Sequence, residues 1–352
     1  MEQAGVVMNS KRIAYLDILK IVAIFAVVMI HIAGAQFGNY STDSFEWAGI
    51  NFIDSSSRWA VPIFAMVSGA LFLDPNRKVS IYKLYTKNIF RLITAFLFWS
   101  VVFALYKAVK SDFSLGIMEF VKTVLLGEYH MWFMYMLAGL YILVPLLRPI
   151  AANKKLLTYA VGVCFFLMLV SGYASIVPGG TTLSLIVSST SLNLGYIGYF
   201  LLGRLLMGAS FSRSVRLLIY AFGVIGFAIT MWGTYVLSVN KASGVLVETL
   251  YEFCTINVAV MALAVFVLVK QMCTLWGSVS GEETRIWKIA FRVADLSLGA
   301  YLLHVFFVWE IVKYPLCCQF PSAYIFGALI LVVSFAVAYI LRKIPFIGKL
   351  IT

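Results

Sequence analysis

The stretch LKIVAIFAVVMIHIAG, residues 19–34, decides the fold class of this chain. It is apolar enough to lie in lipid, yet it carries Lys20 near its start and His31 deep inside it. Similar windows recur along all 352 residues, of which 62% are hydrophobic and 12% are charged, well outside the usual composition of a soluble domain. The sequence therefore predicts an all-α integral membrane protein with a single transmembrane domain, residues 1–352.

We predict a bundle of about ten transmembrane helices from the apolar segments. Each segment approaches the length of about 20 residues that a spanning helix needs. An even number of spans puts the N- and C-termini on the same side of the membrane. The ten segments are residues 17–37, 58–73, 89–109, 131–147, 156–176, 193–208, 215–237, 251–270, 294–312 and 321–341.

The basic residues indicate which side that is. Of the 27 Lys and Arg residues, 21 fall in segments on the side of the N-terminus and six on the other side. By the positive-inside rule, both termini are cytoplasmic. The net charge of +12 is explained by these loops and their contact with anionic lipid headgroups, so nucleic acid is not expected as a partner.

Ionisable side chains inside a span are costly and mark candidate functional sites. Lys20 and His31 are eleven residues apart, about three helical turns, so they share one face at about 16 Å along the axis. Asp17, three residues before Lys20, joins the same polar stripe. A stripe of this kind faces other helices or a water-filled cavity. The alternative is a histidine that only hydrogen-bonds a neighbouring helix, with Lys20 extended to the headgroups.

The other two histidines also lie in or beside a span. His304 lies about ten residues, or 15 Å, into the ninth predicted span, with Tyr301 three residues earlier on the same face. His31 and His304 are therefore predicted at similar depth, where they can line one cavity. His130 lies beside Trp132 at the start of the fourth span, and an ordinary interfacial aromatic belt explains that stretch by itself.

Soluble catalytic signatures are absent from the sequence. We find no phosphate loop, dinucleotide fingerprint, zinc spacing or nucleophile elbow, and we expect no metal. A neutral imidazole can accept a proton from a hydroxyl or carry an acyl group near neutral pH. His31 is therefore the best candidate for chemistry.

Several blocks resemble one family in the family's own order. They are YLDILKIVAIFAVVMIH, RWAVPIFAMVSGALFL, YHMWFMYMLAGLYILVPLLRP, YIGYFLLGRLL and LSLGAYLLHVFF. Together they resemble the acyltransferase-3 integral membrane proteins, which O-acylate surface polysaccharides and related glycans. The resemblance implies a multi-pass enzyme of the bacterial cytoplasmic membrane. It would use acetyl-CoA as acyl donor and modify a hydroxyl of a glycan or a lipid-linked saccharide.

The resemblance also implies roles for individual residues. His31 falls on the family's essential histidine, and we expect it to act as general base or transient acyl carrier. We expect Lys20 and His304 to complete the catalytic set, with His304 and Tyr301 as donors near the developing oxyanion. The candidate acceptor-binding residues are Asp17, Arg58, His130, Trp132 and Tyr301. The candidate acyl-CoA-binding residues are Lys20 and Arg91.

The chain departs from the family pattern at Lys20, where the family usually has arginine. Lysine keeps the positive charge but lacks the planar fork that suits phosphate or carboxylate. Two other readings remain open at this point. A transporter or export module would also use polar groups near the midplane, and a purely structural membrane scaffold would leave the shared depth of His31 and His304 unexplained.

Overall fold

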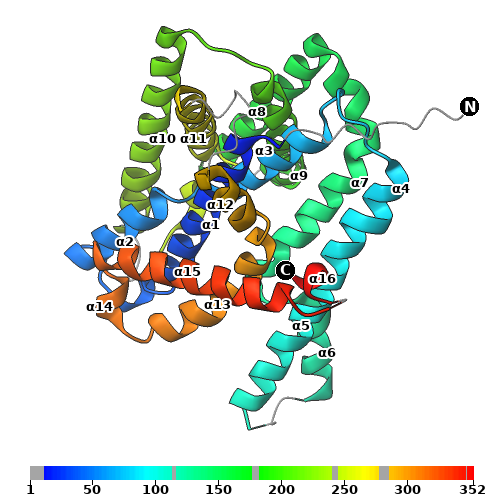
Figure 1. Ribbon diagram of the computed structural model, residues 1–352. Helices are drawn as coiled ribbons and strands as arrows, with labels where there is room; N and C mark the ends of the chain where they lie inside the picture. The colour runs from blue at the N-terminus through cyan, green and yellow to red at the C-terminus, as the bar shows by residue number, and fades with distance from the viewer. Residues whose placement is uncertain (1–11, 113–115, 177–181, 240–244, 277–284, 346) are drawn as a thin grey trace, which may run out of the picture.

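The computed structural model describes residues 12–112, 116–176, 182–239, 245–276, 285–345 and 347–352. Every regular element in these ranges is helical, which confirms the all-α prediction (Figure 1). The long helices are α1 (Ala14–Gly34), α5 (Phe90–Lys110), α7 (Trp132–Ala152), α8 (Lys154–Ile176), α9 (Thr182–Met207), α10 (Arg213–Val239), α11 (Ile256–Leu275), α13 (Ser297–Ile311) and α15 (Ser322–Arg342). The shorter elements are η1 (Phe37–Asn39), α2 (Phe45–Ser55), α3 (Ala60–Phe72), α4 (Ile81–Lys83), η2 (Leu84–Ile89), α6 (Ile117–Leu126), η3 (Tyr129–Met131), η4 (Glu248–Tyr251), α12 (Arg285–Ala294), α14 (Pro315–Cys318) and α16 (Gly348–Ile351).

Each of the ten apolar segments predicted from sequence falls on a helix, namely α1, α3, α5, α7 to α11, α13 and α15. Within the described ranges, six helices are long and apolar enough to cross a membrane. A seventh span results if α12 and α13, bent by 66° at a short break, are counted as one. The protein is thus a multi-pass membrane protein, whereas ten spans and two cytoplasmic termini stay predictions.

Helix α1 forms the centre of the bundle. It packs against α2, α3, α11, α12, α13 and α15, and residues on most of its faces are buried. A helix that is apolar all round belongs in such an interior position. In Figure 1, α10 and α11 lie on one side of it and α5 and α7 on the other. The polar stripe predicted on this helix therefore faces protein.

Helices α3 and α9 approach each other closely through two glycines. A Cβ atom on Gly69 would lie 1.7 Å from the backbone oxygen of Phe200, and one on Gly203 would lie 1.8 Å from the backbone oxygen of Met66. No side chain fits at either position. Small residues allow such backbone contact between helices in a membrane, so these two glycines set the distance between α3 and α9.

The loops divide between two faces of the bundle. We call the face on which α1 begins the N-terminal face. The opposite face, which carries α2, the end of α5, η4 and α14, is the distal face (Figure 1).

Candidate functional site

The three histidines of the chain meet in one place, although they are far apart in sequence. The ring centroids are 5.1 Å apart for His31 and His304, 5.5 Å for His130 and His304, and 6.3 Å for His31 and His130. This confirms the predicted proximity of His31 and His304. It also adds His130, for which an aromatic belt was a sufficient local explanation. We call these three residues the histidine cluster.

Each histidine comes from a different helical element. His31 lies in the last turn of α1, His304 lies inside α13, and His130 lies in η3, directly before α7. His130 and His304 are buried, with 2% and 0% of their surface exposed, whereas His31 is partly exposed. His31 is therefore the least buried residue of the cluster.

The segment that carries His130 is fixed at its start. Gly127 has a positive φ of 72°, and a Cβ atom there would lie 2.7 Å from the ring of Phe96. Only glycine adopts this conformation without strain. The next residue, Glu128, is buried and forms a 2.7 Å ion pair with Lys107 of α5. These contacts hold the short η3 turn against the bundle.

Tyr301 connects the two buried histidines. Its hydroxyl donates a hydrogen bond to the backbone carbonyl of His130, and its own carbonyl is bonded to Nδ1 of His304. Because a carbonyl oxygen can only accept, Nδ1 of His304 carries the hydrogen and Nε2 keeps a free lone pair. Tyr301 thus fixes both the His130 turn and the tautomer of His304.

Several nitrogen atoms of the cluster remain without partners. Nε2 of His304 and both ring nitrogens of His130 are buried, and no described residue offers them a hydrogen bond of good geometry. Most buried polar atoms in proteins are hydrogen-bonded, and the exceptions often belong to functional sites. These atoms are candidates for contact with a substrate or its proton.

Aromatic rings surround the cluster on its remaining sides. The ring of Phe103 lies 5.3 Å from His130 and is stacked on Phe306 at 4.3 Å. The ring of Tyr129, the residue before His130, lies 5.3 Å from His31. Sequence reasoning missed Tyr129 because it also fits an aromatic belt. The apolar rings limit the access of water to the imidazoles.

A cavity of about 250 Å³ extends from the N-terminal face toward the cluster. We call it the N-terminal cavity. Lys20 and Arg91, the two predicted acyl-CoA ligands, both line it, and Tyr301 lines it as well. The remaining lining residues are Phe64, Val67, Ser68, Asn88, Leu92, Phe133, Leu137, Tyr141, Ala294, Asp295, Ser297 and Leu298.

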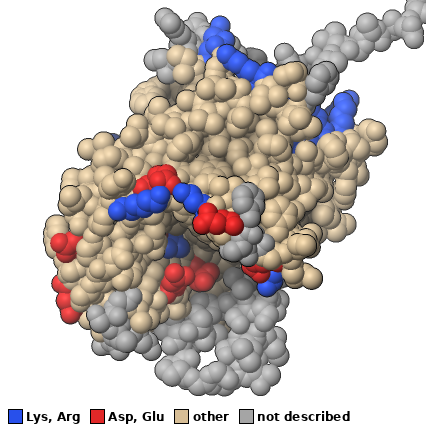
Figure 2. Space-filling model, turned by 90° about the horizontal axis from the view of Figure 1, so that it is seen from below, with Lys and Arg blue, Asp and Glu red and all other residues tan. Residues whose placement is uncertain are grey.

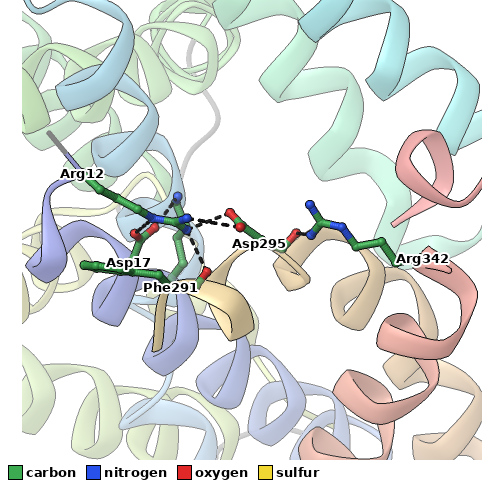
Figure 3. A network of polar contacts seen from close by, with 6 residues as sticks. Arg12, Asp17, Phe291, Asp295 and Arg342 are labelled. Atoms are coloured by element: carbon green, nitrogen blue, oxygen red, sulfur yellow. Dashed lines mark hydrogen bonds and ion pairs between the residues drawn. The ribbon is translucent and has the colours of Figure 1, made fainter. Parts of the chain in front are cut away.

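A charged network lies beside this cavity. The buried carboxylate of Asp17 accepts hydrogen bonds from Lys20 at 3.0 Å and from Arg12 at 2.6 Å. Arg12 also pairs with Asp295 at 2.7 Å, and Arg342 donates to the Asp295 carbonyl at 2.9 Å (Figure 3). Asp17 therefore orients Lys20. It does not itself line the cavity, so the structure gives no direct support to its predicted contact with an acceptor.

Arg12 stays charged in this network. Burial lowers the pKa of Arg12, but its hydrogen bonds to Asp295 and Asp17 outweigh that effect and raise the pKa above its ordinary value. The guanidinium joins the start of α1 to the break between α12 and α13, and it also donates to the carbonyl of Phe291 at 2.8 Å. Sequence reasoning gave Arg12 and Asp295 no part in the site.

Arg91 is held by the last residues of the sequence. Its guanidinium donates to the backbone oxygen of Thr352, and Trp99 of α5 donates to that of Ile351 at 2.8 Å. Thr352 and Ile351 are buried. The segment that contains α16 thus contributes to the wall behind the N-terminal cavity.

A second cavity, of about 410 Å³, lies on the distal face. We call it the distal cavity. It contains the predicted acceptor-binding residues Arg58 and Trp132, and Trp132 follows His130 by two residues. Its other lining residues are Tyr196, Glu248, Tyr251, Glu252 and Phe253. Apart from Asp17, the predicted site residues therefore divide into the N-terminal cavity, the histidine cluster and the distal cavity.

Among the described residues, no group of three or more His, Cys, Asp or Glu side chains has an arrangement that could hold a metal ion. The three imidazoles are in ring contact without forming such a group.

Comparison with known proteins identifies the chain at the level of its family. A family model described as an acyltransferase domain matches residues 13–343. No curated protein and no solved structure matches the chain. Because the family model covers nearly the whole sequence, the protein belongs to the acyltransferase-3 family of membrane acyltransferases.

Proposed function

We propose that the protein transfers an acyl group, most simply acetyl, from cytoplasmic acyl-CoA to a hydroxyl of a surface glycan or a lipid-linked saccharide. The location we propose is a bacterial cytoplasmic membrane. One observation carries this proposal: the histidine cluster is in contact with the N-terminal cavity through Tyr301 and is two residues from Trp132 of the distal cavity.

The N-terminal cavity is the donor site in this proposal. CoA carries phosphates on one end and a thiol on a long arm, so a donor site needs cations at its mouth and a narrow channel to the reacting atoms. Lys20 and Arg91 supply the cations, and the cavity extends from them to Tyr301. Lysine and arginine side chains are the usual partners of phosphate.

His31 carries the transfer, because it is the partly exposed imidazole of the cluster. As a base, it takes the proton of the acceptor hydroxyl while that oxygen attacks the thioester carbonyl. The C–S bond then breaks, and the CoA thiolate receives the proton. As a transient carrier, the His31 nitrogen attacks the thioester carbonyl, the C–S bond breaks, and the CoA thiolate leaves with the imidazole proton. The acceptor hydroxyl then attacks the acyl-imidazole, the N–acyl bond breaks, and the hydroxyl proton returns to the imidazole.

The roles proposed for the neighbours of His31 follow from their hydrogen bonds. The hydroxyl of Tyr301 already donates to the His130 carbonyl, so Tyr301 acts as a positioning residue. His304 offers a lone pair on Nε2, which suits acceptance of a proton. For His304 to donate to a developing oxyanion, as the resemblance implied, its Nε2 must first gain a proton.

Acetyl-CoA turnover by the purified, detergent-solubilised protein, with water or an added saccharide as acyl acceptor, tests the proposal. We expect release of free CoA by the wild type and its loss in His31→Ala. The matched control is Ile142→Ala on α7, where the side chain is 50% exposed on the outside of the bundle. Thermal unfolding of all three proteins verifies that they are folded. Turnover retained by a folded His31→Ala protein would refute the mechanism.

A transport function is the second candidate. The two cavities on opposite faces and the 66° break between α12 and α13 resemble features of secondary transporters. Absence of both CoA release and acetyl-CoA binding by calorimetry would favour this candidate, and substrate flux into vesicles would then test it.

A further inference from the structure

We propose that the distal cavity binds a saccharide without negative charge, either neutral or amino-bearing, and discriminates against anionic saccharides such as those with uronic acids or phosphates. This inference rests on the proposed function, because it names the class of acceptor. It concerns the residues that line the cavity and their charges.

The aromatic side chains of the cavity suit a sugar ring. Trp132 and Phe253 are stacked with ring centroids 5.9 Å apart and an interplanar angle of 24°, and Trp132 is 37% exposed. Tyr196 lies 5.9 Å from Trp132 on another side. Flat, rigid and partly exposed rings provide contact area at low entropic cost, with polar groups beside them for hydroxyls.

The guanidinium of Arg58 is paired with a neighbouring carboxyl group. Its guanidinium forms a 2.6 Å ion pair with Asp54, which is 0% exposed, and lies 4.1 Å from the ring centre of Tyr251. The Nε atom of Arg58 is buried without a hydrogen-bond partner among the described residues. When Asp54 is ionised, its carboxylate offsets the charge of Arg58 and reduces the attraction of the guanidinium for a free anion.

The two glutamates give the cavity a negative charge. Glu248 and Glu252 are exposed, and among the described residues neither has an ion-pair partner within 4.0 Å. Burial raises the pKa of Asp54, and burial together with the neighbouring Glu248 raises that of Glu252. With Asp54 neutral and both glutamates ionised, two carboxylates face the one guanidinium. Figure 2 shows this face, where acidic and basic side chains both lie around a hollow near its centre.

These charges act against an anionic acceptor. An incoming carboxylate or phosphate would lose water and meet two carboxylates of like charge, which is unfavourable. A neutral saccharide avoids this cost, and an ammonium group is attracted by the two carboxylates. Specificity of this kind arises from repulsion of the wrong ligand as well as from attraction of the right one.

Calorimetric titration with three tetrasaccharides tests the inference without any acyl donor. The probes are cellotetraose, which is neutral, chitosan tetramer, which is cationic, and tetragalacturonate, which is anionic. The detergent must have no sugar headgroup, since such a headgroup would compete. We expect the wild type to bind the first two at least about tenfold more tightly than the third.

The charge variant is Glu248→Gln with Glu252→Gln, in which we expect the preference to fall to about threefold or less. The matched control is Asp43→Asn with Glu119→Gln, two exposed acids outside the cavity, which should keep the wild-type preference. Equal binding of tetragalacturonate by the wild type, an unchanged preference in the charge variant, or no binding of any probe would overturn the inference.

The same proteins separate this inference from the proposed function. His31-dependent CoA release without a charge preference in binding would leave the acyl transfer standing and remove the saccharide assignment. A charge preference without CoA release would leave the saccharide site standing and remove the acyl transfer.

Discussion

The three imidazoles differ in hydrogen bonding, and this difference separates their expected contributions. His304 has its tautomer fixed by Tyr301, His130 has two nitrogens without partners, and His31 alone is partly exposed. Hydrogen bonds from neighbouring residues determine how well a reactive group is positioned. Loss of the Tyr301 hydroxyl should therefore change the geometry of the histidine cluster without removing an imidazole.

Tyr301→Phe tests this positioning role. Removal of the hydroxyl leaves the His130 carbonyl unpaired in a buried place. We expect kcat for CoA release to fall about tenfold, the KM for acetyl-CoA to stay within about twofold, and the unfolding free energy to fall by about 1 kcal/mol. Steady-state kinetics and thermal unfolding measure these quantities. Tyr159→Phe, at a residue 70% exposed on α8, is the control, and an unchanged kcat in Tyr301→Phe would contradict the role.

Lys20→Arg restores the side chain that the family usually has. Asp17 already binds Lys20 and Arg12 through its two oxygens, so an arginine at position 20 would keep this ion pair and have further N–H groups for a phosphate. We expect the KM for acetyl-CoA to fall about threefold to tenfold with little change in kcat. Lys20→Met, which removes the charge, should raise the KM about tenfold. A higher KM in Lys20→Arg would show that the cavity is shaped for lysine.

At the scale of residues, the sequence predicted His31 and His304 together because both are costly groups at similar depth. It gave a weaker signal for His130, because its neighbours Tyr129 and Trp132 fit an aromatic belt. His130 could belong to an aromatic belt or to the site, and its contact with Tyr301 distinguishes the two. That contact joins residues 171 positions apart. Local composition carries no information about such a contact.

At the scale of elements, the contact between α3 and α9 is unusually close, and α3 connects it to the central helix α1. Most of α3 is buried, and it packs against α1 as well as α9. Lipid supplies no hydrophobic force between helices, so their association depends on packing at short distance. The glycines at this contact should therefore matter more than glycines elsewhere.

Gly203→Ala and Gly69→Ala should each destabilise the protein. The new methyl group would overlap backbone atoms of the facing helix. Backbone atoms cannot move out of the way as the end of a flexible side chain can. We expect a loss of about 2 kcal/mol or more and a lower unfolding temperature in detergent. Gly139→Ala on α7 is the control, because a Cβ atom there meets nothing within 4 Å. Its unfolding temperature should stay constant or rise slightly, since alanine favours a helix more than glycine does. Equal effects at the three positions would contradict this account.

Hydropathy predicted the positions of the long helices well, because each needs an apolar run to lie in a membrane. Hydropathy missed the elements that form for reasons other than an apolar run. Helix α2 begins at a serine cap, where the Ser44 side chain accepts from the backbone of Trp47. The break between α12 and α13 is joined to α1 by Arg12, a contact between distant parts of the chain. Helix α3 has 13 residues, too few to cross a bilayer alone as a straight helix.

At the scale of the whole molecule, the proposed function requires the two cavities to face different compartments. Acyl-CoA is a cytoplasmic donor, so the N-terminal cavity must open to the cytoplasm. The predicted charge asymmetry of the loops leads to the same orientation, since the ten-span prediction puts 21 of the 27 Lys and Arg residues on the side of the N-terminus. The orientation of the termini is therefore a test of the function as well as of the fold.

Reporter fusions measure this orientation. Green fluorescent protein fused after Thr352 should fluoresce, and alkaline phosphatase at the same position should be inactive, because the first requires the cytoplasm and the second the outside. The pattern should reverse for insertions at Asp112, on the distal face between α5 and α6. Active phosphatase after Thr352 would put the donor cavity on the outside, away from acyl-CoA. Lys20 and Arg91 would then have no donor to bind, and the transport function would become the better explanation of the two cavities.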